Sequence, residues 1–318
     1  MDLLTAGAYG FQMVRSARAR GREGVVPAGV GFGTRVAPAR QVISIVHGLS
    51  ETPLAKFHDR ALRGELLRVP KPIPWEAFQR KRYPAAALEL ATDLAARLAN
   101  GEYASIALFT QITAGLALGG APFDLVHAAT RISSDELRHA EYCIRMAELC
   151  SNGKVTLEID REALLTDVPN ALNREDVDFL VLKYACVGET LAAALLTECR
   201  RRARDKVAKA LFTSLAGDEV GHARFGWYYA AHRVKEWTLA ERQRLADRLA
   251  GFVSGIEPTL WTGRDAPAGA EAATRALGVL DSETQRAVVT DVMTREIIPG
   301  LDALGFGGSV MWAARSRA

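Results

Sequence analysis

The segment DEVGH (Asp218–His222) and its counterpart DELRH (Asp135–His139) decide the fold. Each is a Glu-x-x-His motif with an aspartate directly before the glutamate, and each lies in a long stretch with helical periodicity. A spacing of three places the Glu and His side chains on one face of a helix, about one turn apart. A single Glu-x-x-His is usually a surface pair that arose by chance, whereas two copies with matching aspartates indicate a paired site.

Helical periodicity predicts four long helices in the middle of the chain, which makes the protein all-α. The first pair of helices covers residues 84–118 and 122–150, with Asn100-Gly101 as a candidate break, and the second pair covers 173–202 and 205–235. The connection between the two pairs is about twenty residues, which is too long for a simple hairpin. The expected architecture is therefore a four-helix bundle with a long crossover between its second and third helices.

The remaining segments predict additional helices around this bundle. Residues 1–83 are expected to form an N-terminal extension with short helices, and 236–318 to form helices packed on the bundle formed by 84–235, within a single domain overall. Thr238 begins a capping box that starts a fifth helix. A sixth helix is expected over 282–298 and should be stopped by Pro299-Gly300, with an irregular Gly-rich tail after it.

Two further glutamates match the motifs in their level along the bundle. Glu102 and Glu136 lie at nearly equal distances from a turn near residue 120, and Glu189 and Glu219 lie at equal distances from a turn near residue 204. The rivals Glu89 and Glu198 would lie far from this level. Since Glu102 and Glu189 border apolar runs, and a buried carboxylate without a partner is costly, these glutamates require a cation.

A metal site of four carboxylates and two imidazoles follows from this pattern. Such a donor set suits iron or manganese better than a closed zinc site. The two aspartates, Asp135 and Asp218, are expected to accept hydrogen bonds from the imidazole N–H groups and to orient the rings. The predicted metal ligands, through which catalysis would occur, are Glu102, Glu136, His139, Glu189, Glu219 and His222.

The pattern resembles the oxygen-activating branch of the ferritin-like di-iron carboxylate superfamily. Bacterial multicomponent monooxygenase hydroxylases show similar Asp-Glu-x-x-His pairs, often with an arginine before the histidine, as Arg138 stands here. Arylamine N-oxygenases are similar more loosely, because they carry an additional histidine where this chain has Leu215. The resemblance covers roughly residues 84–235 and implies a ferritin-like four-helix bundle, two bound irons and reaction of the reduced site with O2.

The resemblance implies a non-haem di-iron oxygenase or oxidase. With O2 as co-substrate, such an enzyme would hydroxylate, N-oxygenate or desaturate a small-molecule or carrier-bound organic substrate. The alternative is a ferroxidase or an iron-handling ferritin-like protein without an organic substrate. An electron-transfer partner and a homodimer are further expectations. The basic runs Arg15–Arg22 and Arg200–Arg204 are read first as solvated surface and second as a docking site for an acidic partner.

Composition narrows the remaining function classes. A net charge of +3 over 318 residues gives no reason to expect a nucleic-acid partner. No apolar run reaches the length of a membrane span, which is about 18 residues. The four cysteines lack Cys-x-x-Cys spacing, and the N-terminus lacks the pattern of a secretory signal, so a cytoplasmic protein with reduced thiols is expected.

Overall fold

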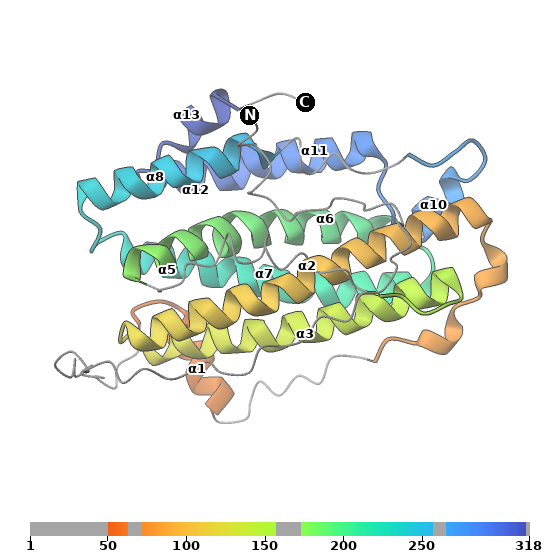
Figure 1. Ribbon diagram of the computed structural model, residues 1–318, viewed down its shortest axis with the longest axis horizontal. Coiled ribbons are helices and arrows are strands. Elements are labelled where there is room, and N and C mark those ends of the chain that lie inside the picture. Colours follow the sequence, from red (N-terminus) through yellow and green to blue (C-terminus); the bar gives the residue numbers. More distant parts are fainter. Residues whose placement is uncertain (1–49, 63–71, 157–172, 257–264, 316–318) are drawn as a thin grey trace, which may run out of the picture.

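The computed structural model describes residues 50–62, 72–156, 173–256 and 265–315. Throughout these ranges the chain forms helices, turns and connecting segments and contains no β-strand, so the protein is all-α as predicted (Figure 1). The long helices run side by side along the longest dimension of the molecule.

Long helices form the centre of the molecule. They are α2 (Ala85–Leu118), α3 (Phe123–Ser151), the continuous segment made of α5 (Arg174–Leu180), η3 (Val181–Gly188) and α6 (Glu189–Arg202), and α7 (Lys206–Arg233). Helix α2 packs along α3, η3 and α6 pack along α7, and α3 also contacts α7. The helix ranges predicted from the sequence are confirmed, except that α2 passes through Asn100-Gly101 without a break.

Polar side chains cap α5 and α7. The helical segment that begins with α5 carries Glu189, and α7 carries Glu219 and His222. The Asn173 side chain accepts a hydrogen bond from the amide of Asp176, and Asp205 accepts from the amides of Val207 and Ala208. These bonds satisfy amides that have no partner within the helix, which explains why α5 and α7 begin where they do.

A π-helix separates α5 from α6 and was not predicted from the sequence. It spans Val181–Gly188 and ends directly before Glu189. The hydroxyl of Thr190 donates to the carbonyl of Cys186 (2.5 Å) and accepts from the indole N–H of Trp227 (3.0 Å), which ties this segment to α7. Single π-turns within α-helices are frequent at functional sites.

Shorter helices surround the bundle. Helices α8 (Leu239–Ser254), α11 (Ser282–Val292) and α12 (Ile298–Ala303), together with the π-turn η4 (Met293–Ile297), lie along the α5–η3–α6 side, with α13 (Gly308–Ala313) beyond them (Figure 1). Helix α10 (Glu271–Ala276) contacts α2, and α1 (Leu54–Leu62) contacts α3. Two short 3-10 turns, η1 (Trp75–Ala77) and η2 (Arg80–Arg82), precede α2.

Two details of the C-terminal region differ from the sequence-based expectation. Pro299-Gly300 does not stop the sixth helix, because the π-turn η4 and α12 continue it without a gap from Met293 to Ala303. The Gly-rich tail is not irregular throughout, since it contains α13. The predicted capping box at Thr238 is confirmed at the start of α8.

Apolar side chains form separate layers along the bundle. One cluster includes Ala99, Cys143 and Leu215, and another includes Phe109 and Ile132, which lie further along the same central helices. The candidate ligands on α2, α3 and α7 lie between these two layers in sequence. A third cluster joins α6, η3 and α7 to α8, α11 and α12.

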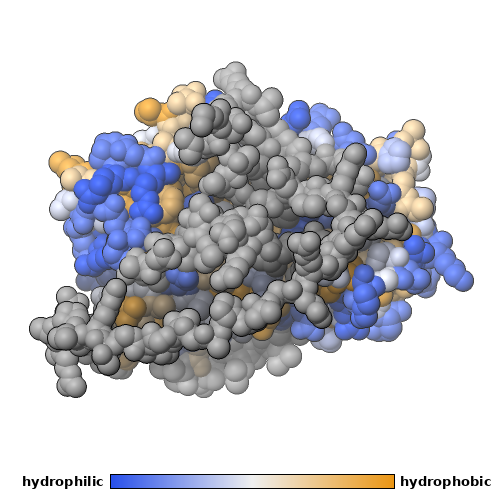
Figure 2. All heavy atoms as spheres, in the orientation of Figure 1, coloured by the Kyte–Doolittle hydropathy of each residue, from blue (hydrophilic) through white to orange (hydrophobic). Residues whose placement is uncertain are grey.

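Among the described residues, one helical segment is long and apolar enough to cross a membrane by length and composition. It is Arg174–Arg202, and 72% of its apolar stretch is buried inside the protein. Burial of this kind is typical of the core helix of a soluble protein. Figure 2 shows hydrophilic residues on the left and right of the described surface, with hydrophobic residues between and beside them.

Candidate metal centre

The structure brings together the side chains of all the predicted ligands. Glu102 comes from the middle of α2, Glu136 and His139 from α3, Glu189 from the first residue of α6, and Glu219 and His222 from α7. All are buried, with exposed fractions between 0% for His139 and 8% for Glu102. Residues as polar as these are rarely buried unless they have partners.

The side chains form two groups that could each hold a metal ion. The first contains Glu102 and His139, the second contains Glu189 and His222, and both include Glu136 and Glu219. Within each group, one ligand atom per residue lies within 4.8 Å of all the others. If each group held an ion, Glu136 and Glu219 would be shared between the two, while each of the other four residues would belong to one ion only.

The two imidazole rings present the same nitrogen to the carboxylates. His139 Nδ1 lies 3.1 Å from a Glu219 oxygen and 3.6 Å from a Glu102 oxygen. His222 Nδ1 lies 3.0 Å from a Glu136 oxygen and 3.1 Å from a Glu219 oxygen. The ring centroids are 5.8 Å apart. Both Nδ1 atoms consequently point into the space that the carboxylates surround.

The other nitrogen of each ring meets an aspartate from the opposite helix. His139 Nε2 on α3 lies 3.1 Å from Asp218 on α7, and His222 Nε2 on α7 lies 3.4 Å from Asp135 on α3. A carboxylate at Nε2 keeps the proton on that nitrogen and leaves Nδ1 free to bind a metal. The aspartates therefore lie where the sequence expectation requires, and their roles cross between the two motifs.

Unsatisfied atoms in this cluster indicate that the donors fit a cation. Glu136 Oε1 and His139 Nδ1 are buried and make no hydrogen bond. Elsewhere the chain satisfies a buried carboxylate fully: Asp178 accepts from Tyr229 (2.6 Å), from two guanidinium nitrogens of Arg233 (2.9 and 2.7 Å) and from Trp237 (2.7 Å). The nitrogens that approach the carboxylates of the centre are the Nδ1 atoms of His139 and His222, which belong to the same ligand groups, so a metal ion is a partner that fits the whole donor set.

The electrostatics of the centre are those of a site that lacks positive charge. Burial, together with the neighbouring carboxylates, raises the pKa of Glu136 and the pKa of Glu189 well above the usual range. Burial alone would lower the pKa of each histidine, but contacts with the surrounding carboxylates raise both histidine pKa values well above 6.5. Without a metal the cluster therefore retains protons, and a bound cation would replace them.

The rival glutamates lie elsewhere. Glu198 forms ion pairs with Arg201 and Arg202 near the surface, and these partners, Arg201 first, lower its pKa to about 2. Glu89 belongs to neither ligand group. His58 and His127 contact each other at 3.0 Å between α1 and α3, and neither they nor His232 belong to a ligand group, whereas His47 lies outside the described residues.

Arg138 lies in the site, but no role was predicted for it from the sequence. Its side chain contacts both Asp135 and Asp218. The signal for this role was the difference between the two motifs, since DELRH contains an arginine where DEVGH contains Gly221. Phe109, whose ring centroid lies 6.3 Å from that of His222, was also missed because nothing in the sequence distinguishes it from other core residues.

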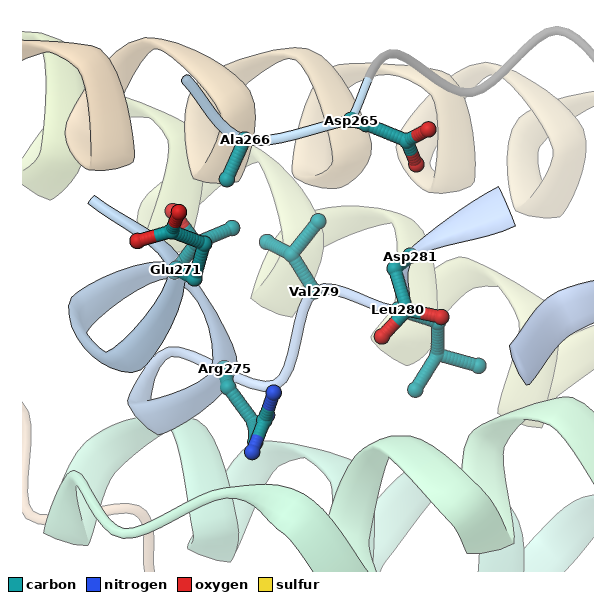
Figure 3. A pocket seen from close by; sticks show the side chains of 8 residues that line it. Asp265, Ala266, Glu271, Arg275, Val279, Leu280 and Asp281 are labelled. Atoms are coloured by element: carbon teal, nitrogen blue, oxygen red, sulfur yellow. The ribbon is translucent and has the colours of Figure 1, made fainter. Parts of the chain in front are cut away.

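A cavity of about 120 Å³ lies apart from this centre (Figure 3). It is bordered by residues of α10 and by the segments on either side of it, including Asp265, Glu271, Arg275 and Asp281. Asp281 already caps α11 through the amide of Thr284 and contacts Arg202. Because no candidate ligand lines this cavity, it is not part of the metal centre.

Comparisons with protein-family models, with characterised proteins and with solved structures found no match to this chain. The geometry of the centre is therefore the basis for assigning a function.

Proposed function

We propose that the protein is a ferritin-like non-haem di-iron oxygenase or oxidase that uses O2 to oxidise an organic substrate. The observation that carries the proposal is the pair of ligand groups that share Glu136 and Glu219. A glutamate from each of two helices and a Glu-x-x-His from each of the other two is the donor set of ferritin-like di-metal carboxylate proteins.

The donor chemistry supports iron, with manganese as the alternative metal. Four carboxylates offset the charge of two divalent ions, and oxygen-rich sites with two imidazoles fit these metals better than zinc. When bound, a pair of ferrous ions supplies electrons for the reduction of O2.

The protein's own residues hold and shield this chemistry. Asp135 and Asp218 contact the imidazole rings and would hold their orientation, and the four glutamates would hold the metal ions. Apolar layers flank the centre, with Cys143 and Leu215 on one side and Phe109 and Ile132 on the other. Apolar surroundings of this kind would limit unproductive side reactions with water.

Metal content tests the ligand set. After anaerobic loading with Fe(II) and removal of excess metal, the wild-type chain is expected to retain two irons. Glu219→Ala removes a shared ligand and is expected to retain less than one, while Glu102→Ala is expected to lose one of the two ions. Glu198→Gln is the matched control, because this glutamate pairs with surface arginines and should leave the iron content unchanged. Undiminished iron in Glu219→Ala would refute the assignment.

Oxygen consumption tests the reaction class. The Fe(II)-loaded chain is exposed to ¹⁸O2 with panels of amines, carboxylic acids and carrier-bound acyl groups, and the products are analysed by mass spectrometry. The proposal predicts ¹⁸O in an organic product, or a new double bond, in amounts that depend on the iron content. Repeated oxidation of added Fe(II) into a mineral core, with no organic product, would contradict it and would point to a ferroxidase.

A further inference from the structure

We propose that Arg138 is a positioning residue that links the two halves of the metal centre, so that both metal ions depend on one guanidinium group. The inference rests on the proposed di-metal function and goes beyond it by assigning a task to a residue outside the ligand set. It concerns how binding at one ion position is coupled to binding at the other.

A single atom of Arg138 contacts both orienting aspartates. Nη2 lies 2.8 Å from Asp135 Oδ1 and 2.9 Å from Asp218 Oδ2. The same Asp218 oxygen lies 3.1 Å from His139 Nε2, and the other Asp135 oxygen lies 3.4 Å from His222 Nε2. The contacts therefore form one continuous chain that runs from His222 through Asp135, Arg138 and Asp218 to His139.

Only one of the two motifs, DELRH, supplies a side chain that can form this link. In DEVGH the equivalent residue is Gly221, which has no side chain to offer. The two motifs are otherwise matched, so one arginine on α3 serves the aspartates of both α3 and α7. The Arg138 side chain is 24% exposed and that of Asp218 is 34% exposed. This series of contacts therefore lies at the outer edge of the centre, where it borders solvent.

Removal of the guanidinium group would affect both rings. The two aspartates would lose their shared donor and would repel each other, because like charges held close together in a partly buried site are unfavourable. Each aspartate could then turn away from its imidazole. Loss of an outer partner of a metal-binding histidine typically weakens metal binding by about 10- to 100-fold.

The competing explanation is an ordinary surface ion pair. Arg138 and Asp135 are three residues apart on one helix, and exposed pairs of this kind contribute little to stability. A pair of that sort would have no effect on metal binding. The two explanations therefore predict different metal affinities for the same substitution.

The experiment measures Mn(II) binding to the full-length metal-free chain, using the electron paramagnetic resonance signal of free Mn(II). Arg138→Met is expected to raise the dissociation constants of both binding steps by about tenfold or more. It should also reduce the fraction of spin-coupled Mn(II) pairs at low temperature. Arg138→Lys retains a charge that can donate to both carboxylates and is expected to give intermediate constants. Arg145→Met, on the same helix but stacked on Trp75, is the control and should bind as the wild type does.

Each outcome separates the inference from the proposed function. Unchanged constants in Arg138→Met, or weakening of only one step, would overturn the coupling role of Arg138 and would leave the di-metal centre standing. A wild-type chain that fails to bind two Mn(II) ions would overturn the proposed centre itself. Thermal unfolding of the metal-free variants tests the fold, and the intermediate constants of Arg138→Lys provide a second test if Arg138→Met is unstable.

Discussion

The two imidazoles of the centre are oriented by aspartates from the opposite helices. The sequence identifies these aspartates, because each directly precedes a glutamate of a Glu-x-x-His motif. It does not identify which ring each aspartate serves, since that depends on how α3 packs against α7. Asp218 serves His139 and Asp135 serves His222. Spacing along one helix therefore predicted the members of the site, and contacts between helices decided their pairing.

Gly221 offers a direct check of the near-symmetry between the motifs. A Cβ atom built at this position would meet nothing within 4 Å, so a side chain fits there. We expect Gly221→Arg, introduced into Arg138→Met, to restore part of the lost Mn(II) affinity, because residue 221 stands to Asp218 as residue 138 stands to Asp135.

The control for this rescue is Gly221→Leu in the same background, which adds apolar bulk without charge. Calorimetric titration with Mn(II) would distinguish the two double variants. Equal affinities for the arginine and leucine variants would show that charge at this position does not hold the aspartates.

At the scale of the elements, the π-helix η3 packs closely against α7 and ends directly before Glu189. The helical ranges were predictable from apolar periodicity and from the capping residues Asn173 and Asp205. The π-helix was not, because its sequence VLKYACVG has the composition of an ordinary buried helix. It is recognised only once η3 is packed against α7, where Gly226 lies against the backbone of Ala185.

Two glycines of α7 test this contact. A Cβ atom at Gly226 would lie 2.6 Å from the carbonyl carbon of Ala185, whereas a Cβ atom at Gly217 would meet nothing within 4 Å. Gly226→Ala should therefore destabilise the protein by about 1–3 kcal/mol through overpacking. Gly217→Ala should stabilise it by up to about 1 kcal/mol, because alanine favours the helix.

Urea unfolding of the two alanine variants measures both effects, and iron content reports the consequence for the centre. We expect Gly226→Ala to retain less iron than Gly217→Ala, because displacement of η3 also displaces Glu189. Similar unfolding midpoints for the two variants would mean that η3 and α7 are not closely packed in solution.

At the scale of the whole molecule, the described cysteines are all buried thiols in helices. Burial raises the pKa of each above the ordinary value of 9.0, to about 12 for Cys150 and Cys199 and in the same direction for Cys143 and Cys186. The absence of disulfides among the described residues agrees with the expected reduced state. The cytoplasmic location remains a prediction.

These thiols predict a loss of stability at alkaline pH. In the unfolded chain a thiol ionises near its ordinary pKa, whereas in the folded chain Cys199 stays protonated up to about 12. The folded state then binds more protons than the unfolded state, so stability falls as pH rises from about 9 toward 12. Cys199→Ala should show a smaller fall than the wild type when urea unfolding is followed between about pH 8 and pH 11. A parallel decline in both proteins would exclude this contribution from Cys199.

The parts of the molecule outside the central helices were the least predictable. The capping box at Thr238 identified the start of α8. Nothing in the sequence showed that α11, η4 and α12 would continue past Pro299, since a proline within a helical pattern usually ends or kinks the helix. The division into an N-terminal extension, a bundle and C-terminal helices remains a prediction.

The ligands are divided between two helical hairpins, so the order of translation determines when a complete ligand group can form. A ribosome completes α2 and α3 before α6 and α7, and the first hairpin supplies only Glu102, Glu136 and His139. One of the two shared carboxylates, Glu219, and the partner aspartate of His139 arrive last, on α7. A nascent chain therefore cannot assemble either complete ligand group. A metal ion held by either complete group would therefore be bound only after α7 has been translated.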